Sequence, residues 1–166
     1  MKKFELTAEF VTNIFGKKLF RIKALVAFCD VEKGELGGFI EKEDNLSHSG
    51  DAWVYGDAQV YGNAQVYGNA QVSGDAWVSG DAWVSGNADY AVVTGFGHCF
   101  RATTFFRCKD KILRVQCGCF YGDLAKFREI VKKTHGDSKY AKEYLAIADL
   151  MELHFSDEEE NQEADK

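Results

Sequence analysis

Proline is absent from the 166-residue chain, so its turns must be made by glycine together with asparagine or aspartate. Long apolar runs are also absent: none reaches the ~18 residues that a membrane-spanning helix needs. The N-terminus is basic, but Glu5 and Glu9 interrupt the apolar core that a signal peptide requires. Five cysteines, an odd number, in a chain that lacks an export signal indicate reduced thiols, and we expect a cytoplasmic protein.

Positive charge is missing from the middle of the chain. Residues 51–92 contain five acids and no lysine or arginine, whereas residues 93–155 contain eleven bases and seven acids. The net charge of −6 therefore hides a basic C-terminal part. Residues 156–166 carry six acids, one lysine and no large apolar side chain, so we expect a disordered tail that aids solubility.

A six-residue period dominates the base-free segment. From Asp51 the sequence matches Asp/Asn-Ala-x-Val-x-Gly six times in succession and ends at Gly86. The alanine and valine of each hexad lie two residues apart, so on an extended strand both face the same way. Glycine every sixth residue would cost a helix about 1 kcal/mol each time. The repeat therefore predicts a solenoid of short strands with a small alanine–valine interior.

The hexads resemble the repeat of left-handed parallel β-helices, in which three hexads form one triangular coil. The strings at residues 34–41, 103–107 and 118–122 are similar to those of hexapeptide-repeat proteins encoded by phages and prophages, often labelled acetyltransferase-like or polymer-forming. The resemblance implies that residues three hexads apart stack at the strand spacing of about 4.8 Å. We expect a mainly β fold: a short left-handed parallel β-helix with a β-rich N-terminal cap and a small α+β (ββαα) C-terminal module.

Two coils bury too little apolar surface to fold alone, so both flanking modules are needed as caps. The expected divisions are an N-terminal β cap, the β-helix, the basic C-terminal module and the disordered tail, at residues 1–44, 45–95, 96–155 and 156–166. In the C-terminal module, alternation predicts two strands over residues 102–108 and 112–117. Asp123 caps a predicted helix that stops at Gly136, and Asp137 or Ser138 caps a second one.

The positions on either side of each valine place aromatic rings outside the predicted solenoid. These residues are Trp53, Tyr55, Tyr61, Tyr67, Trp77 and Trp83. Because a monomer rarely exposes so much apolar area, we expect a homo-oligomer, a dimer or trimer, with these rings in the interface. The alternatives are that the end modules fold over some faces, or that the tryptophans stack on a sugar.

Positive charge concentrates around the predicted hairpin. The candidate anion-binding residues are Arg101, Thr103, Arg107, Lys109, Arg114 and His135. Arginine forks suit phosphate and carboxylate, and threonine and histidine add donors. We expect an anionic small molecule such as a nucleotide signal to bind here. The alternative is a solvated strand face that balances the acidic solenoid and tail.

The remaining cysteine and histidine patterns predict no metal and no cofactor. Cys99, Cys108, Cys117 and Cys119 contain no C-x-x-C pair for zinc, so we expect buried small hydrophobes. The resemblance to hexapeptide acyltransferases implies a general-base histidine at a subunit interface, and His48 lies at the entrance of the solenoid. However, the perfect hexads contain no histidine, lysine or arginine to meet the phosphates of acetyl-CoA.

We therefore expect no catalytic residue and a phage-type protein that acts by binding an anionic ligand or a host defence protein. An acyltransferase that uses acetyl-CoA and a structural, polymer-forming scaffold are the two alternatives.

Overall fold

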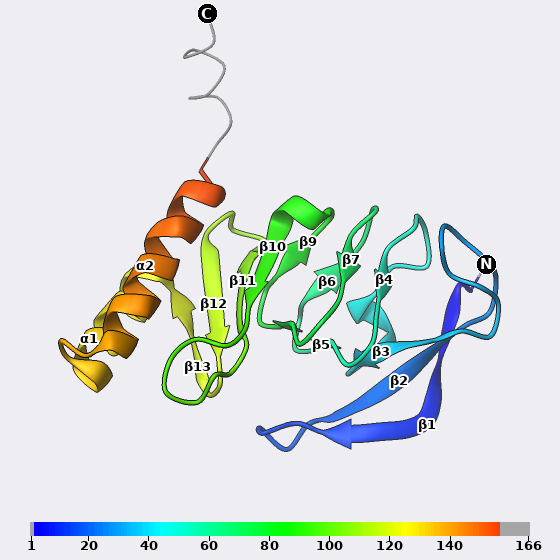
Figure 1. The fold of residues 1–166 in the computed structure, drawn as a ribbon. Coiled ribbons are helices and arrows are strands. Elements are labelled where there is room, and N and C mark those ends of the chain that lie inside the picture. The colour runs from blue at the N-terminus through cyan, green and yellow to red at the C-terminus, as the bar shows by residue number, and fades with distance from the viewer. Residues whose placement is uncertain (1, 157–166) are drawn as a thin grey trace, which may run out of the picture.

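The computed structural model describes residues 2–156, in which a solenoid lies between an N-terminal sheet and a C-terminal α+β module (Figure 1). The N-terminal strands are β1 (Phe4–Thr12), β2 (Lys18–Ala24) and β3 (Leu36–Ile40). β1 and β2 form a long antiparallel hairpin, and β3 pairs antiparallel with β2 and parallel with β5 of the solenoid. The predicted disordered tail lies, apart from Ser156, outside the described residues.

Six two-residue strands build the solenoid. They are β4 (Trp53–Val54), β5 (Gln59–Val60), β6 (Gln65–Val66), β7 (Gln71–Val72), β8 (Trp77–Val78) and β9 (Trp83–Val84). Each strand pairs in parallel with the one three hexads later: β4 with β7, β5 with β8, and β6 with β9. The expected stacking of residues three hexads apart is therefore confirmed.

The interior of the coils is made of the alanine and valine of each hexad. All twelve of these side chains are at most 1% exposed. Because alternate residues of a strand face opposite ways, both residues point inward and the residues on either side of valine point outward. This confirms the orientation that the repeat predicts.

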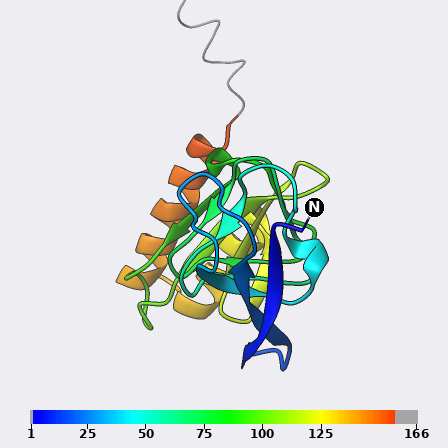
Figure 2. The same cartoon turned by 90° about the vertical axis from the view of Figure 1, so that its right-hand side faces the viewer.

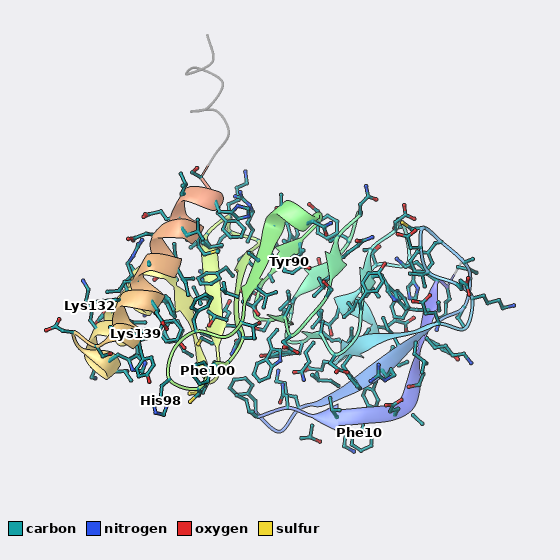
Figure 3. The ribbon with its side chains drawn as sticks, in the orientation of Figure 1. Phe10, Tyr90, His98, Phe100, Lys132 and Lys139 are labelled. Carbon is teal, nitrogen blue, oxygen red and sulfur yellow. The ribbon has the colours of Figure 1, made fainter. Side chains whose placement is uncertain are left out.

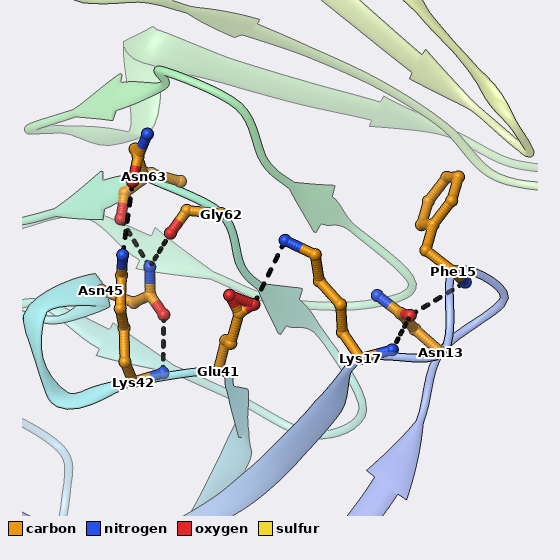
Figure 4. A network of polar contacts seen from close by, with 9 residues as sticks. Asn13, Phe15, Lys17, Glu41, Lys42, Asn45, Gly62 and Asn63 are labelled. Atoms are coloured by element: carbon orange, nitrogen blue, oxygen red, sulfur yellow. Dashed lines mark hydrogen bonds and ion pairs between the residues drawn. The ribbon is translucent and has the colours of Figure 1, made fainter.

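A short 3₁₀ turn, η1 (Glu43–Asn45), joins β3 to the first coil (Figure 4). The fully buried Asn45 accepts a hydrogen bond from the Lys42 amide at 2.9 Å through Oδ1. Its Nδ2 donates to the carbonyls of Gly62 and Ala64, at 3.2 and 2.9 Å. One side chain thus satisfies three backbone groups and fixes where the coil begins.

The N-terminal module covers part of the solenoid's exterior. The Trp53 ring is fully buried and packs edge-on against Phe28 and Phe4, at centroid distances of 5.3 and 6.4 Å. Tyr61 is buried in a second cluster with Leu19 of the hairpin, against which Trp77 also packs. The β1–β2 hairpin runs beneath the first coils in Figure 1, and seen from the N-terminal side it lies in front and points downward (Figure 2).

The C-terminal module contains four strands and two helices. They are β10 (Tyr90–Val93), β11 (Thr103–Arg107), β12 (Leu113–Cys117), β13 (Phe120–Asp123), α1 (Leu124–His135) and α2 (Lys139–His154), preceded by the 3₁₀ turn η2 (Asn87–Asp89). Asp123 accepts from the Lys126 amide and Gly136 ends α1, as predicted, while Ser138 caps α2. β10 and β13 have no counterpart among the strands predicted from the sequence. No helix within residues 2–156 combines the length and apolarity that crossing a bilayer requires.

The four-stranded sheet, in the order β10-β11-β12-β13, stands between the last coil and the helices. Phe106 packs into the solenoid core, while its neighbour Phe105 packs against the helices. The Trp77 amide donates to Thr104 Oγ1 at 2.9 Å, on the solenoid side of the sheet. The sheet therefore closes the C-terminal end of the solenoid, while Phe4 and Ile22 of the N-terminal strands join the same core from the other module.

Candidate functional site

The structure does not bring the six predicted anion-binding residues together. Thr103 is 2% exposed and donates to Cys117 Sγ at 3.3 Å, on the face of β11 that the helices cover. Both terminal nitrogens of Arg114 donate hydrogen bonds to the carboxylate of Asp110, at 2.9 and 3.1 Å. Thr103 is covered because strand alternation alone does not reveal which face of a hairpin another element will cover, and Arg114 is engaged by a residue of its own hairpin turn.

The other four predicted residues divide between two hollows. Arg101 and His135 line a cavity beside α1, whereas Arg107 and Lys109 line a groove where the last coil meets the β11–β12 hairpin. This second hollow, called the Trp83 groove below, has a volume of about 510 Å³. Its lining is Tyr67, Trp83, Ser85, Asp89, Arg107, Cys108, Lys109 and Lys111. Two predicted anion-binding residues therefore meet two of the predicted outward aromatic rings.

The aromatic wall of the Trp83 groove is fixed in place. Trp83 is 39% exposed, and its indole Nε1 donates to Gln65 Oε1 of the preceding coil at 2.9 Å. Tyr67 meets Trp83 edge to face, with ring centroids 6.1 Å apart. Lys109 holds its ammonium 5.6 Å from the centre of a Trp83 ring. An aromatic surface and a cation therefore share one groove.

The charged side chains of the Trp83 groove differ in how many contacts they make within the protein. Arg107 Nε lies 3.4 Å from Asp89 Oδ1, and its Nη2 donates to the Phe155 carbonyl at 3.2 Å. Asp89 also accepts from the amide and hydroxyl of Ser85, at 2.9 and 2.8 Å. Within residues 2–156, neither Lys109 nor Lys111 forms an ion pair. These two lysines are the cations that a ligand could engage.

The remaining predicted interface residues differ in accessibility. Trp53 and Tyr61 are buried within the chain, and burial raises the pKa of Tyr61 to about 12. Tyr55 and Trp77 are half-buried against the N-terminal module. Of the six rings, Trp83 is the exposed one, and the half-buried Tyr67 lies beside it in the Trp83 groove. The other four rings, those of Trp53, Tyr55, Tyr61 and Trp77, fit the alternative that an end module folds over some faces of the solenoid.

His48, the residue that the acyltransferase hypothesis requires as a base, joins the N-terminal strand to the solenoid. Its Nδ1 accepts from the Lys3 amide at 3.1 Å, and its Nε2 lies 2.8 Å from Glu43 Oε1. The ring stacks on Phe4 at a centroid distance of 4.2 Å. The hydrogen bond between Glu43 and His48, followed by the one between Glu43 and Lys2, lowers the pKa of the Glu43 carboxyl. Both ring nitrogens are therefore occupied by structural contacts.

The cysteines are less buried than the sequence analysis expected. Cys108 is buried, but Cys99 and Cys119 are exposed and Cys117 is half-buried. Burial raises the pKa of the Cys108 thiol to about 11. In the described part of the chain, no three histidine, cysteine or acidic side chains gather in a way that could hold a metal ion. The expectation of buried cysteines is wrong for Cys99 and Cys119, because both lie in loops rather than in strands.

Comparison with known proteins identifies the repeat. A family model described as the YdcK beta solenoid repeat matches residues 58–70, 64–80 and 70–86. The matches lie within the parallel-paired hexads and reach neither end module. No curated protein matches the chain. The chain is therefore a β-solenoid repeat protein, and its end modules and hollows must be interpreted from their own residues.

Proposed function

We propose that this β-solenoid protein is a non-catalytic binding protein whose ligand is an anionic aromatic small molecule of the nucleotide class. The observation that supports the proposal is the meeting, in the Trp83 groove, of an exposed indole with Lys109 and Lys111, which form no ion pair within residues 2–156. Stacking of a base on an aromatic side chain contributes about 1–3 kcal/mol, and lysine binds phosphate as a point charge. A groove of about 510 Å³ is in the size range of small-molecule sites.

The contacts of His48 favour binding over acyl transfer. A general base needs a nitrogen within reach of the proton that it abstracts, and both His48 nitrogens already contact Lys3 and Glu43. The closed ends favour a discrete particle over a polymer, since Phe106 of the C-terminal sheet and Phe4 and Ile22 of the N-terminal strands are buried in the solenoid core.

We further propose the biological setting that the resemblance to phage proteins implies. The coils wind left-handed, and the protein acts as a dimer or trimer in the host cytoplasm. There it sequesters a nucleotide signal of the host's defence or occludes a defence protein.

The test is equilibrium binding of a nucleotide panel, comprising mono-, di- and cyclic dinucleotides, by calorimetry. We expect the double variant Lys109→Glu/Lys111→Glu to weaken binding at least about tenfold, since each charge-assisted contact contributes about 1.5–3 kcal/mol. Trp83→Ala should weaken it about fivefold or more through lost stacking. Lys23→Glu, on an exposed position of β2, is the matched control and should bind normally.

Arg107 is unsuitable for this test because its reversal would also break contacts with Asp89 and Phe155. Nucleotide binding that survives the double lysine reversal would overturn the proposal. Binding of a neutral oligosaccharide that depends on Trp83 but not on the lysines would assign the groove to sugars instead. Release of free thiol from acetyl-CoA would contradict the non-catalytic role.

A further inference from the structure

A second hollow, called the Cys99 cavity below, lies in the C-terminal module and shares no residue with the Trp83 groove. It has a volume of about 310 Å³. Its wall includes His98, Cys99, Arg101, Cys117, His135 and Tyr144, and the proposed function uses none of them. His98 and Phe100 mark the loop that carries Cys99, at the edge of the module (Figure 3).

This loop, residues 94–102, is held against α2. The Gly97 amide donates to Glu143 Oε2 at 2.9 Å, and the Tyr144 hydroxyl lies 3.5 Å from the Phe96 carbonyl. A Cβ added at Gly118, whose φ is +57°, would collide with the guanidinium of Arg101. The absence of a side chain at Gly118 therefore lets Arg101 lie against the β12–β13 turn, beside the cavity.

Cys99 lies among cationic and proton-donating groups. Its Sγ is 3.5 Å from Nδ1 of His98, and Arg101 lines the same cavity. The contact with His98 first, and then the nearby guanidinium of Arg101, lower the pKa of the exposed Cys99 thiol. Since the thiolate is the nucleophilic form of cysteine, the same contacts increase the reactive fraction at neutral pH.

The walls of the Cys99 cavity combine apolar and cationic groups. Phe120, Phe127 and Val131 supply an apolar surface, while Arg101 and His135 supply donors. His135 is stacked on Tyr144 with ring centroids 5.8 Å apart, so its position is fixed. An apolar or aromatic body with a carboxylate suits such a wall, because the body packs on the rings and the carboxylate pairs with guanidinium.

We propose that Cys99 is a thiol-modification site that forms a mixed disulfide with small disulfides that carry a carboxylate. The Cys99 thiolate attacks one sulfur of the small disulfide, and a new bond forms between the two sulfurs. The original disulfide bond breaks, and its electron pair leaves with the second sulfur as a thiolate. Oxidant and leaving group both come from the small disulfide, so the step needs no other reactant.

The experiment follows the reaction of the folded protein with an aromatic dicarboxylate disulfide, 5,5′-dithiobis(2-nitrobenzoate), by stopped flow at pH 7. We expect one thiol to react about tenfold faster than the others, because a lowered pKa increases the thiolate fraction. This fast phase should disappear in Cys99→Ser and persist in Cys29→Ser and Cys119→Ser, which remove the other two exposed thiols. Intact mass after one equivalent should show a single adduct.

A neutral aromatic disulfide, 2,2′-dithiodipyridine, separates recognition of the carboxylate from thiol reactivity. Arg101→Gln should slow the reaction of Cys99 with both probes. It should slow the reaction with the dicarboxylate more, so the rate with the dicarboxylate divided by the rate with the neutral disulfide falls several-fold. A fast phase that survives in Cys99→Ser, or equal rates for Cys29 and Cys99, would overturn the site. A rate ratio unchanged by Arg101→Gln would overturn the preference for a carboxylate. Neither result bears on nucleotide binding in the Trp83 groove.

Discussion

At the scale of single residues, Lys3 shows how the N-terminal strand is attached to the solenoid. Its ammonium is almost fully buried and donates to the carbonyls of Ala52 and Gly50, at 2.6 and 3.3 Å. It also lies 4.8 Å from the centre of the Phe28 ring. Burial lowers the pKa of Lys3 to about 8, and the opposing effect of Asp51 is smaller.

This lowered pKa predicts a pH dependence of stability. Between pH 8 and 10.5, the unfolded chain keeps a proton on Lys3 that the folded chain has lost. Because the unfolded state binds more protons in this window, the contribution of Lys3 to the unfolding free energy increases as the pH rises from 8 to 10.5. Denaturant unfolding between pH 7.5 and 10.5, compared with Lys3→Met, measures it. Identical pH slopes for the two proteins would contradict the prediction.

The sequence predicts residue positions where a local rule decides them. The inward alanines and valines follow from strand alternation, and Asp123 follows from helix capping. The burial of Trp53 could not be predicted, because it depends on Phe4 and Phe28, which are distant in sequence. The Trp83 groove was missed for the same reason. Its two components were recognised separately, and only the folded chain places Lys109 over Trp83.

At the scale of the elements, the corners between the short strands limit how closely the coils can stack. Gly56 and Gly68 both adopt left-handed backbone, with φ of +58° and +64°. A Cβ at Gly68 would lie 2.5 Å from the Ser85 carbonyl oxygen of the next coil, whereas a Cβ at Gly56 meets nothing within 4 Å. A side chain at either glycine would therefore meet the same cost of left-handed backbone, but only at Gly68 would it also collide with the next coil.

This pair separates backbone strain from coil contact. We expect Gly56→Ala to lower the unfolding free energy by about 1–2 kcal/mol, the cost of left-handed backbone for a residue with a Cβ. Gly68→Ala should lower it by about 3 kcal/mol or more, since backbone would also have to shift. Chemical denaturation of both variants gives the comparison. Equal losses would show that the corners do not control the spacing of the coils.

Element boundaries in the C-terminal module were harder to predict than those in the solenoid. β10 begins where the seventh hexad decays at Tyr90, so the sequence shows only the loss of a pattern. β13 is four residues long and starts directly after Cys119, too short for alternation to identify. Both strands are defined by pairing with β11 and β12, which is a tertiary property.

At the scale of the whole molecule, one strand joins two hydrophobic cores. β11 directs Phe106 into the solenoid core and Phe105 into the helix core. A buried hydrogen bond of 2.9 Å from Ser79 Oγ to Gln116 Oε1 also crosses from a coil to the sheet. Because short solenoids need caps to be stable, we expect the two cores to unfold as one cooperative unit.

The two cores carry separate spectroscopic signals, which makes this expectation testable. All three tryptophans lie in the solenoid, and both long helices lie in the C-terminal module. Tryptophan fluorescence and circular dichroism at 222 nm should therefore give coincident denaturation curves. Transitions at two different denaturant concentrations would show that the modules are independent.

Substitution of Phe106, the β11 residue that packs into the solenoid core, should shift the fluorescence and circular dichroism transitions together. Phe106→Ala removes a fully buried ring and should cost about 3–5 kcal/mol, while the milder Phe106→Leu keeps a folded protein available for measurement. Phe100→Ala is the matched control, because its ring is 65% exposed and its loss should change stability by less than about 0.5 kcal/mol. If Phe106→Leu destabilised only the fluorescence transition, the sheet would be a separate domain and not the cap on which the solenoid depends.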